Sequence, residues 1–157
     1  MEKLDEGLLE KLRAWCSSQE RCASELRRKL KRYGADPEQV SRYQQLLVDE
    51  KYIDERKFAE AFVQGKSRIK HWGPMKIRSG LRMKGIPSNM IDELLKDLDT
   101  EEMAETIDQL LVRKWPTIRA KDAYDKKQKA IRFLAAKGYK VSMAYTALER
   151  LEKSLED

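Results

Sequence analysis

Apolar residues recur along this chain every three or four positions, which is the spacing of one face of an α-helix. The first such stretch predicts an amphipathic helix from the start of the chain to about Gln19, with Leu4, Leu8, Leu12 and Trp15 on its apolar face. Asp36 and Pro37 form a second helix start, an acidic N-cap followed by a proline. The apolar stripe of that helix is Val40, Tyr43, Leu46 and Leu47. Because no stretch alternates as a strand does, the pattern predicts an all-α protein.

A short basic helix in the middle of the chain has a signal at each end. Gly73 and Pro74 indicate its start, because proline at the first helical position has the right φ and gives up an N–H that would have no partner. Gly85 is expected just after the last turn, where a left-handed conformation satisfies the final carbonyls. Ile77 and Leu81 fall on one face and predict the buried side.

The pattern of this helix occurs three times, each time ending at a glycine. Gly34 precedes Gly85 by 51 residues (85 minus 34), and Gly138 follows it by 53 (138 minus 85). Leu26 and Leu30 precede Gly34 as the two apolar residues of the middle helix precede Gly85. We therefore assign five residues to the scaffold: Gly34, Gly73, Pro74, Gly85 and Gly138.

The repeats predict about nine helices in an elongated, right-angled array of tandem three-helix units. The expected boundaries are an N-terminal helix over 1–22, a first repeat over 23–70, a second over 71–116 and a truncated third over 117–157. Trp115 and Pro116 should end the last helix of the second repeat, because proline disfavours helical geometry in the residue before it. Ser142 is expected to cap the final helix.

Charge lies in bands along the chain, which has 33 Lys and Arg against 27 Asp and Glu and a net charge of +6. No acidic residue occurs from Ala61 to Ile91, and an acidic band from Asp92 to Asp108 follows, which either solvates a face or contacts a basic partner. The alternative interpretation of the basic bands is simple solvation of outer helix faces. Ten cations are the candidate contacts for a partner or DNA: Arg27, Arg28, Lys31, Lys76, Arg78, Arg82, Lys84, Lys126, Lys127 and Arg132.

Few residues have the pattern of a catalytic or metal site. His71 is the single histidine, which disfavours a zinc cluster or a His-based triad, and it is expected to pack or cap. Cys16 and Cys22 are expected to be free thiols in a reducing compartment. The isolated glycines form no phosphate-binding loop, and no apolar run could span a membrane. We therefore expect a cytoplasmic monomer that is not an enzyme and needs no cofactor or metal. The tryptophans are expected to pack at helix ends rather than stack on nucleobases: Trp15, Trp72 and Trp115.

Three stretches of the sequence together resemble the RecX regulatory proteins. They are Trp72-Gly73-Pro74 with Ile77, Leu81 and Lys84-Gly85-Ile86, the run from Asp54 to Val63, and Glu25-Leu26-Arg27 through Leu30. The resemblance runs from about Leu12 to the C-terminus. Cys22 stands where the family usually has a serine that caps the next helix, and Glu25 is the other half of that capping box.

The resemblance implies a cytoplasmic bacterial protein that binds the filament of the RecA recombinase on DNA. Members of this family are tandem three-helix repeats that lie along the filament groove and restrain strand exchange, ATP hydrolysis and co-protease activity, within DNA repair, DNA recombination and the SOS response. A basic surface spanning several protomers would gain affinity by multivalency. Two alternatives stay open: a helical-repeat protein that binds single- or double-stranded DNA directly, and a structural adaptor without a nucleic-acid role.

Overall fold

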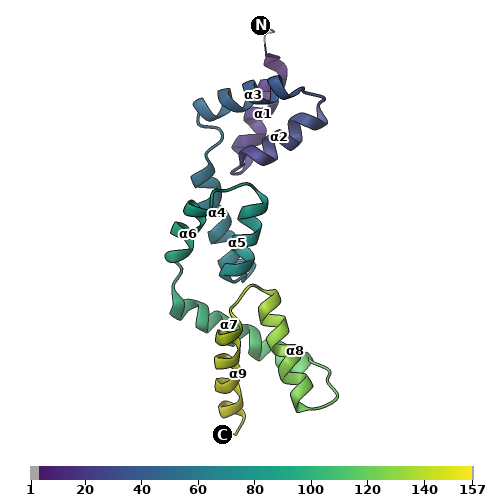
Figure 1. Ribbon diagram of the computed structural model, residues 1–157, viewed down its shortest axis with the longest axis vertical. Helices are drawn as coiled ribbons and strands as arrows, with labels where there is room; N and C mark the ends of the chain where they lie inside the picture. The colour runs from purple at the N-terminus through teal and green to yellow at the C-terminus, as the bar shows by residue number, and fades with distance from the viewer. Residues whose placement is uncertain (1–3, 157) are drawn as a thin grey trace. The chain divides into compact units, whose positions relative to one another are not determined.

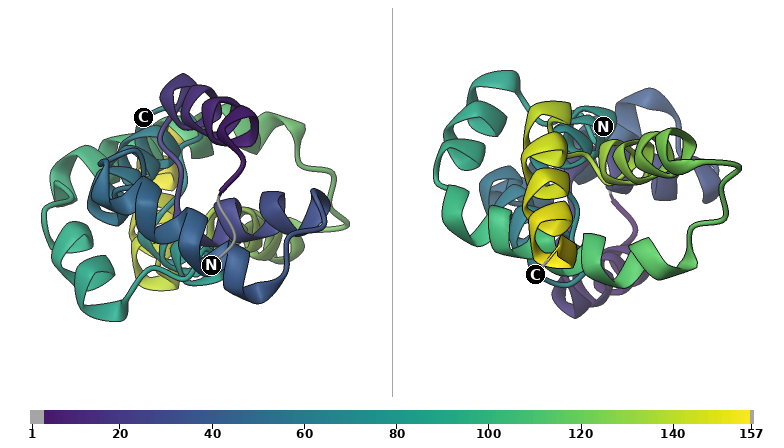
Figure 2. Two further views of the ribbon diagram at one scale, coloured as in Figure 1. Left: turned by 90° about the horizontal axis from the view of Figure 1, so that it is seen from above. Right: turned by 90° about the horizontal axis from the view of Figure 1, so that it is seen from below.

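The computed structural model describes residues 4–156, and within them the chain forms nine α-helices and no strand (Figures 1 and 2). This confirms the predicted all-α fold. One helix ends at Lys114, directly before Trp115 and Pro116, as their sequence predicts. The elements are α1 (Glu6–Ser18), α2 (Ala23–Arg32), α3 (Pro37–Asp49), α4 (Glu55–Arg68), α5 (Pro74–Met83), α6 (Ser88–Lys96), α7 (Thr100–Lys114), the 3₁₀ turn η1 (Trp115–Thr117), α8 (Ala123–Ala136) and α9 (Val141–Glu156).

The helices belong to two compact units, and the division falls inside α4, α5 and α6. One unit contains the chain up to Phe62 together with Leu81–Ile91, and the other contains Val63–Gly80 and the chain from Asp92 onward. In the first unit, α1, α2 and α3 share a hydrophobic core. In the second, α7, α8 and α9 share another. The repeat boundaries predicted after residues 22 and 116 fall between helices that share a core, and they stay a prediction about the repeat.

The first helix turns a slightly different face to its core than the leucine spacing predicts. Leu12 is completely buried as expected, but the other buried residues of this helix are Leu9 and Cys16, which are 2% and 7% exposed. Two partner helices, α2 and α3, decide which face is covered, and the spacing along one helix does not reveal their positions. The other three residues of the predicted stripe lie partly buried at the edge of the core: Leu4, Leu8 and Trp15.

Two helices of the first unit begin at aspartates that cap them. The Leu8 N–H donates to the carboxylate of Asp5 at 3.1 Å, which caps α1. At the start of α3, the Gln39 N–H donates to Asp36 at 2.9 Å, and the Gln39 side-chain oxygen accepts from the Asp36 N–H at 3.0 Å. This reciprocal pair is a capping box, and it confirms the helix start predicted at Asp36.

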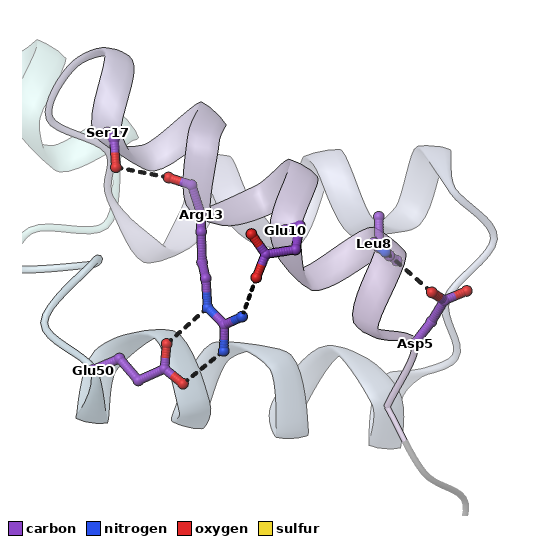
Figure 3. Close-up of polar contacts among 6 residues, drawn as sticks. All are labelled: Asp5, Leu8, Glu10, Arg13, Ser17 and Glu50. Carbon is purple, nitrogen blue, oxygen red and sulfur yellow. Dashed lines mark hydrogen bonds and ion pairs between the residues drawn. The ribbon is translucent and has the colours of Figure 1, made fainter.

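Arg13 of α1 connects two helices of the first unit through its guanidinium group (Figure 3). Its Nε and Nη2 atoms donate to the two carboxylate oxygens of Glu50, each at 2.9 Å. Its Nη1 atom donates to Glu10 at 2.7 Å. The hydrogen bond from Arg13 lowers the pKa of the Glu50 carboxyl. Glu50 lies at the end of α3, so the two hydrogen bonds from Arg13 to its carboxylate hold α1 against α3.

Two glutamates hold the start of α2. The Cys22 N–H donates to Glu25 at 3.2 Å, which is the half of the capping box that the sequence predicts. The Ala23 N–H donates to Glu55 of α4 at 2.8 Å, so a second carboxylate satisfies the same helix end. Cys22 itself is completely buried, and burial raises the pKa of its thiol. Carboxylates at this end also complement the helix dipole.

The helices α2, α5 and α8 end in the same way. Their glycines, Gly34, Gly85 and Gly138, have φ angles of +80°, +81° and +100°. In each case the N–H of the residue after the glycine donates to the carbonyl of a completely buried leucine, which is the Schellman arrangement. The three bonds are Ala35 to Leu30 at 3.1 Å, Ile86 to Leu81 at 3.1 Å and Tyr139 to Leu134 at 3.2 Å.

In the second unit, the start of α5 lies against the turn between α8 and α9. The Gly73 N–H donates to the Lys137 carbonyl at 2.7 Å, and the Met75 N–H donates to the Gly138 carbonyl at 3.0 Å. A Cβ atom on Gly73 would lie 2.4 Å from the carbonyl carbon of Gly138. One on Gly138 would lie 2.5 Å from the Cβ of Lys76. Neither backbone could approach so closely with a side chain present.

The last helix begins earlier than the sequence predicts, so the expected cap at Ser142 is wrong. The helix starts at Val141, and the carbonyl of Lys140 accepts from the N–H groups of Met143 and Ala144, each at 3.1 Å. These bonds place Lys140 at the N-cap position and Ser142 inside the first turn. The turn that leaves Gly138 sets this start, and no small polar residue occupies it.

Candidate partner-binding surface

Three exposed cations of α2 have no ion pair or hydrogen bond to their side chains within residues 4–156: Arg28, Lys31 and Arg32. We call these three residues the α2 cations. They lie three and four positions apart, so they share one face of the helix. Their neighbour Arg27 donates to the side-chain oxygen of Gln44 on α3 at 3.2 Å. Like charges this close repel one another, and an anionic partner would relieve that repulsion.

The four candidate cations of α5 and its C-terminal turn differ from one another. Arg82 is exposed and has no ion pair in the described part of the chain. Carboxylates from outside the acid-free stretch of sequence nevertheless reach two of these cations. The other three are engaged within the protein: Lys76 lies 4.5 Å from the centroid of the Trp72 ring, Arg78 pairs with Asp92 of α6, and Lys84 pairs with Glu25 of α2 at 3.2 Å.

Most candidate cations of α8 are also engaged. Lys126 lies 4.5 Å from the centroid of the Trp115 ring. Lys127 pairs with Glu152 of α9 at 2.8 Å. Arg132 is exposed and has no ion pair among the residues that the structure describes. Two of the three candidate cations on α8 thus contribute to the packing of their own unit, and one remains open to a partner.

Each tryptophan is partly buried and has a cation of the same chain near its ring. Such cation–π contacts are worth about 0.5–1 kcal/mol at exposed sites. Because side chains of the chain already cover these rings, the arrangement favours the packing role over base stacking. The distances to the ring centroids are 4.4 Å for Arg21 and 4.9 Å for Lys29 at Trp15, 4.6 Å for Lys66 and 4.5 Å for Lys76 at Trp72, and 4.5 Å for Lys126 at Trp115.

His71 acts through its backbone. Its φ is +57°, and its carbonyl accepts a hydrogen bond from the Tyr139 hydroxyl at 2.9 Å. Burial raises the pKa of Tyr139 to about 12, so the hydroxyl remains a donor at neutral pH. The cavity beside His71 has a volume of about 50 Å³, too small for a metabolite. This histidine is part of the connection between α4 and α5.

The two cysteines are free and buried. Burial raises the pKa of Cys16 to about 11, which keeps its thiol protonated and poorly nucleophilic at neutral pH. Within residues 4–156, no three His, Cys, Asp or Glu side chains are grouped so that they could hold a metal ion. The same part of the chain contains no helix that is both long and apolar enough to cross a membrane.

The residues that hold the engaged cations were missed by sequence reasoning. Glu25 is 59 positions from Lys84, and Asp92 is 14 positions from Arg78. Glu55, which accepts from the start of α2, is 32 positions from Ala23. No spacing rule along one helix links residues so far apart. The acidic band that begins at Asp92 is the one signal that could have suggested a partner for Arg78.

The fold and the surface together define a helical-repeat protein with exposed cations on α2, α5 and α8 that have no ion pair among the described residues. Two sequence models of RecX domains match it: the second three-helix domain over residues 54–95 and the third over residues 100–148. The first range covers α4, α5 and nearly all of α6, and the second covers α7, α8 and the first half of α9, so the models begin their units at α4 and α7. The chain belongs to the RecX family.

Relatives and solved structures agree with this assignment. The regulatory protein RecX of Chlorobaculum tepidum is 33% identical over 116 residues, which cover 74% of this chain and 70% of that protein. The RecX of Clostridium perfringens is 30% identical over 81% of this chain and 60% of its own length. That of Leuconostoc mesenteroides is 30% identical over 71% of this chain and 42% of its own length. The chain thus spans roughly half the length of these last two relatives.

Two crystal structures share the fold. The structure of RecX from Lactobacillus salivarius superposes with a TM-score of 0.77 at 22% identity, over 92% of this chain and 94% of that one. A second structure, of regulatory protein RecX, gives a TM-score of 0.82 at 25% identity over 94% of this chain and 79% of that one. These two structures therefore share the all-α fold of this chain.

Proposed function

We propose that this protein binds the RecA–DNA filament and inhibits the recombinase, ATPase and co-protease activities of RecA. The observation that carries the proposal is membership of a family whose relatives are named regulatory proteins. RecA as the partner follows from the family resemblance of the sequence. On this proposal the protein acts as a monomer in the bacterial cytoplasm, where the filament forms, and it works by binding rather than by catalysis.

The unpaired cations supply a physical basis for binding a nucleoprotein filament. The α2 cations, Arg82 and Arg132 are all exposed, and each can approach a phosphate or a carboxylate without breaking an ion pair of the described chain. Each contact of this kind is weak alone, and several made at once add through multivalency. Release of counterions from DNA would strengthen the contacts to phosphates.

The test is a RecA ATPase assay on single-stranded DNA into which this protein is titrated. We expect saturable inhibition. A triple variant of the α2 cations, Arg28→Gln with Lys31→Gln and Arg32→Gln, should raise the half-inhibitory concentration about tenfold. Absence of inhibition by the unmodified protein would exclude the proposal.

A matched control separates the position of these charges from their number. The variant Lys11→Gln with Lys57→Gln and Lys153→Gln neutralises three exposed lysines elsewhere, and it also changes the net charge from +6 to +3 (6 minus 3). It should inhibit like the unmodified protein. If both triple variants lose inhibition equally, the α2 surface is not a specific contact.

Direct binding to DNA is the second candidate, and the exposed cations of α2 favour it as well. Binding to bare DNA through phosphates should weaken with salt, with a log–log slope of about −0.9 per contact on duplex and about −0.7 on single strands. The RecA proposal expects filament binding to persist at a salt concentration that abolishes binding to bare DNA. Equal loss of both would favour the DNA-binding alternative.

A further inference from the structure

A groove with a volume of about 460 Å³ lies between α8 and α9. Tyr124 and Gln128 line it from α8, and Tyr145, Leu148 and Glu149 line it from α9. Both helices belong to the same compact unit and share its core. The volume falls in the range of sites that enclose one small organic group. None of the proposed contacts to RecA or DNA uses this groove.

The two tyrosines of the groove are open to a ligand. Tyr124 is 71% exposed and Tyr145 is 43% exposed. The Gln128 side-chain nitrogen lies 3.5 Å from the Tyr145 hydroxyl, which helps to orient that ring. Among the described residues neither ring has a cation above it, whereas all three tryptophans do. These two rings therefore offer aromatic faces that the cations of the chain leave free.

The charge of the groove favours a cationic occupant. Lys127 and Glu152 neutralise each other in an ion pair of 2.8 Å. Glu149 is exposed and has no ion pair within residues 4–156, so one uncompensated carboxylate remains. A phosphate group would meet repulsion from this carboxylate, whereas a guanidinium or ammonium group would be attracted by it and by the tyrosine rings. Leu148, which is 4% exposed, gives an apolar floor for an aliphatic stem.

We propose that this groove binds an arginine or lysine side chain presented by a partner protein. The cation pairs with Glu149 and lies against the ring of Tyr124 or Tyr145, while its methylene groups cover Leu148. The groove contains none of the α2 cations, and its uncompensated charge is negative whereas theirs is positive. It would let the protein hold an anionic surface with one unit and a basic protein segment with another.

The test uses the full chain with labelled tyrosine rings, observed by NMR. The probe is the capped peptide acetyl-Leu-Arg-Leu-amide, and acetyl-Leu-Glu-Leu-amide is its control. The arginine peptide should shift the ring signals of Tyr124 and Tyr145 in a saturable manner, and the glutamate peptide should not. The Tyr33 ring, which has Lys29 at 5.8 Å, should not respond. No shift at either groove tyrosine would overturn the proposal.

Two further experiments test the role of the Glu149 carboxylate and the chemical class of the ligand. Glu149→Gln should weaken binding of the arginine peptide about two- to fivefold, and Glu105→Gln, an exposed position on α7, should leave it unchanged. Equal effects of the two variants would overturn the assignment of Glu149. An oligothymidylate of eight nucleotides should not shift the groove tyrosines. If it shifted them as the arginine peptide does, the groove would be a nucleic-acid site and the proposal would be wrong.

Discussion

The helices α2 and α8 have similar sequences, in that each is basic and is followed by a glycine, but their side chains are engaged differently. Both carry a run of cations, and both end at a glycine in a Schellman arrangement. On α2, the cations Arg28, Lys31 and Arg32 point outward without partners in the described chain. On α8, Lys126 lies over a tryptophan and Lys127 pairs with a glutamate of α9. A basic run therefore offers unpaired charge to a partner only where the neighbouring helices supply no carboxylate or aromatic ring to it.

The ends of the two helices differ as well. A Cβ atom on Gly34, at the end of α2, would meet no atom within 4 Å. The equivalent atom on Gly138, at the end of α8, would lie 2.5 Å from the Cβ of Lys76 and 2.6 Å from its nitrogen. The end of α2 is thus open, whereas the end of α8 is fixed against α5. The same Schellman motif therefore ends α2 at a turn with open space around its glycine and ends α8 at a turn packed closely against α5.

The largest expected effect tests this difference between the two glycines. Gly34→Ala should cost about 1–2 kcal/mol of unfolding free energy, the penalty of a left-handed backbone for a residue with a side chain. Gly138→Ala should cost about 2–5 kcal/mol, because overpacking adds to the same penalty. Urea unfolding of both variants measures the costs. Equal losses would show that the contact between Gly138 and Lys76 carries no strain.

The next test separates binding from stability in the two basic runs. Neutralising the α2 cations to glutamine should lower the salt slope of DNA or filament binding by roughly 2–3 and leave the unfolding free energy nearly unchanged. The pair Lys126→Gln and Lys127→Gln should instead lose about 1 kcal/mol of stability, since it removes a cation–π contact and an ion pair. Salt titration and urea unfolding of each variant provide the two readouts. The comparison fails if the α8 variant loses affinity and the α2 variant loses stability.

The starts of the two helices give a smaller contrast. Asp122 caps α8 by accepting from the Asp125 N–H at 2.7 Å, and Asp122→Ala should cost about 1 kcal/mol. Glu25→Ala at the start of α2, introduced into a Lys84→Met background in which its ion pair with Lys84 is already absent, should cost about half as much, because Glu55 still accepts from Ala23. Thermal unfolding followed by circular dichroism compares them. If Glu25→Ala proves the costlier, the second glutamate does not support α2.

The smallest expected effect is a dependence on pH at the start of α8. Hydrogen bonds from the Lys121 N–H and then from Lys129 lower the pKa of Asp125 below its ordinary value of 3.8. A carboxyl whose pKa is lowered by folding stabilises the fold fully above that ordinary value, and the contribution disappears as pH falls through the folded value. An acid titration of helicity should therefore show a steeper loss below pH 3.8 for the unmodified protein than for Asp125→Asn. Identical acid profiles would contradict this.

The sequence by itself determined the features that depend on neighbours along the chain. Helix periodicity identified Leu26, Leu30, Ile77 and Leu81, all of which are completely buried. The starts at Asp36 and Pro74 and the left-handed ends at the three glycines also follow from local chemistry. Such features lie within one or two turns of helix, where backbone geometry fixes which residues meet. The similar spacing of the three glycines, 51 and 53 residues, indicated the repeat.

Only the tertiary structure decided which charges remain available and which face each helix buries. The sequence does not distinguish Arg78 and Lys84 from Arg28 and Lys31, but carboxylates 14 and 59 positions away pair with the first two. The contact between Gly73 and Gly138, and the exposed tyrosines beside Glu149, likewise join residues that no periodicity connects. Electrostatic pairing depends on distance in space, and helix packing brings together side chains whose separation along the chain is arbitrary. The charges that remain available to a partner therefore depend on packing, whereas the starts and ends of the helices depend on residues that are neighbours in the sequence.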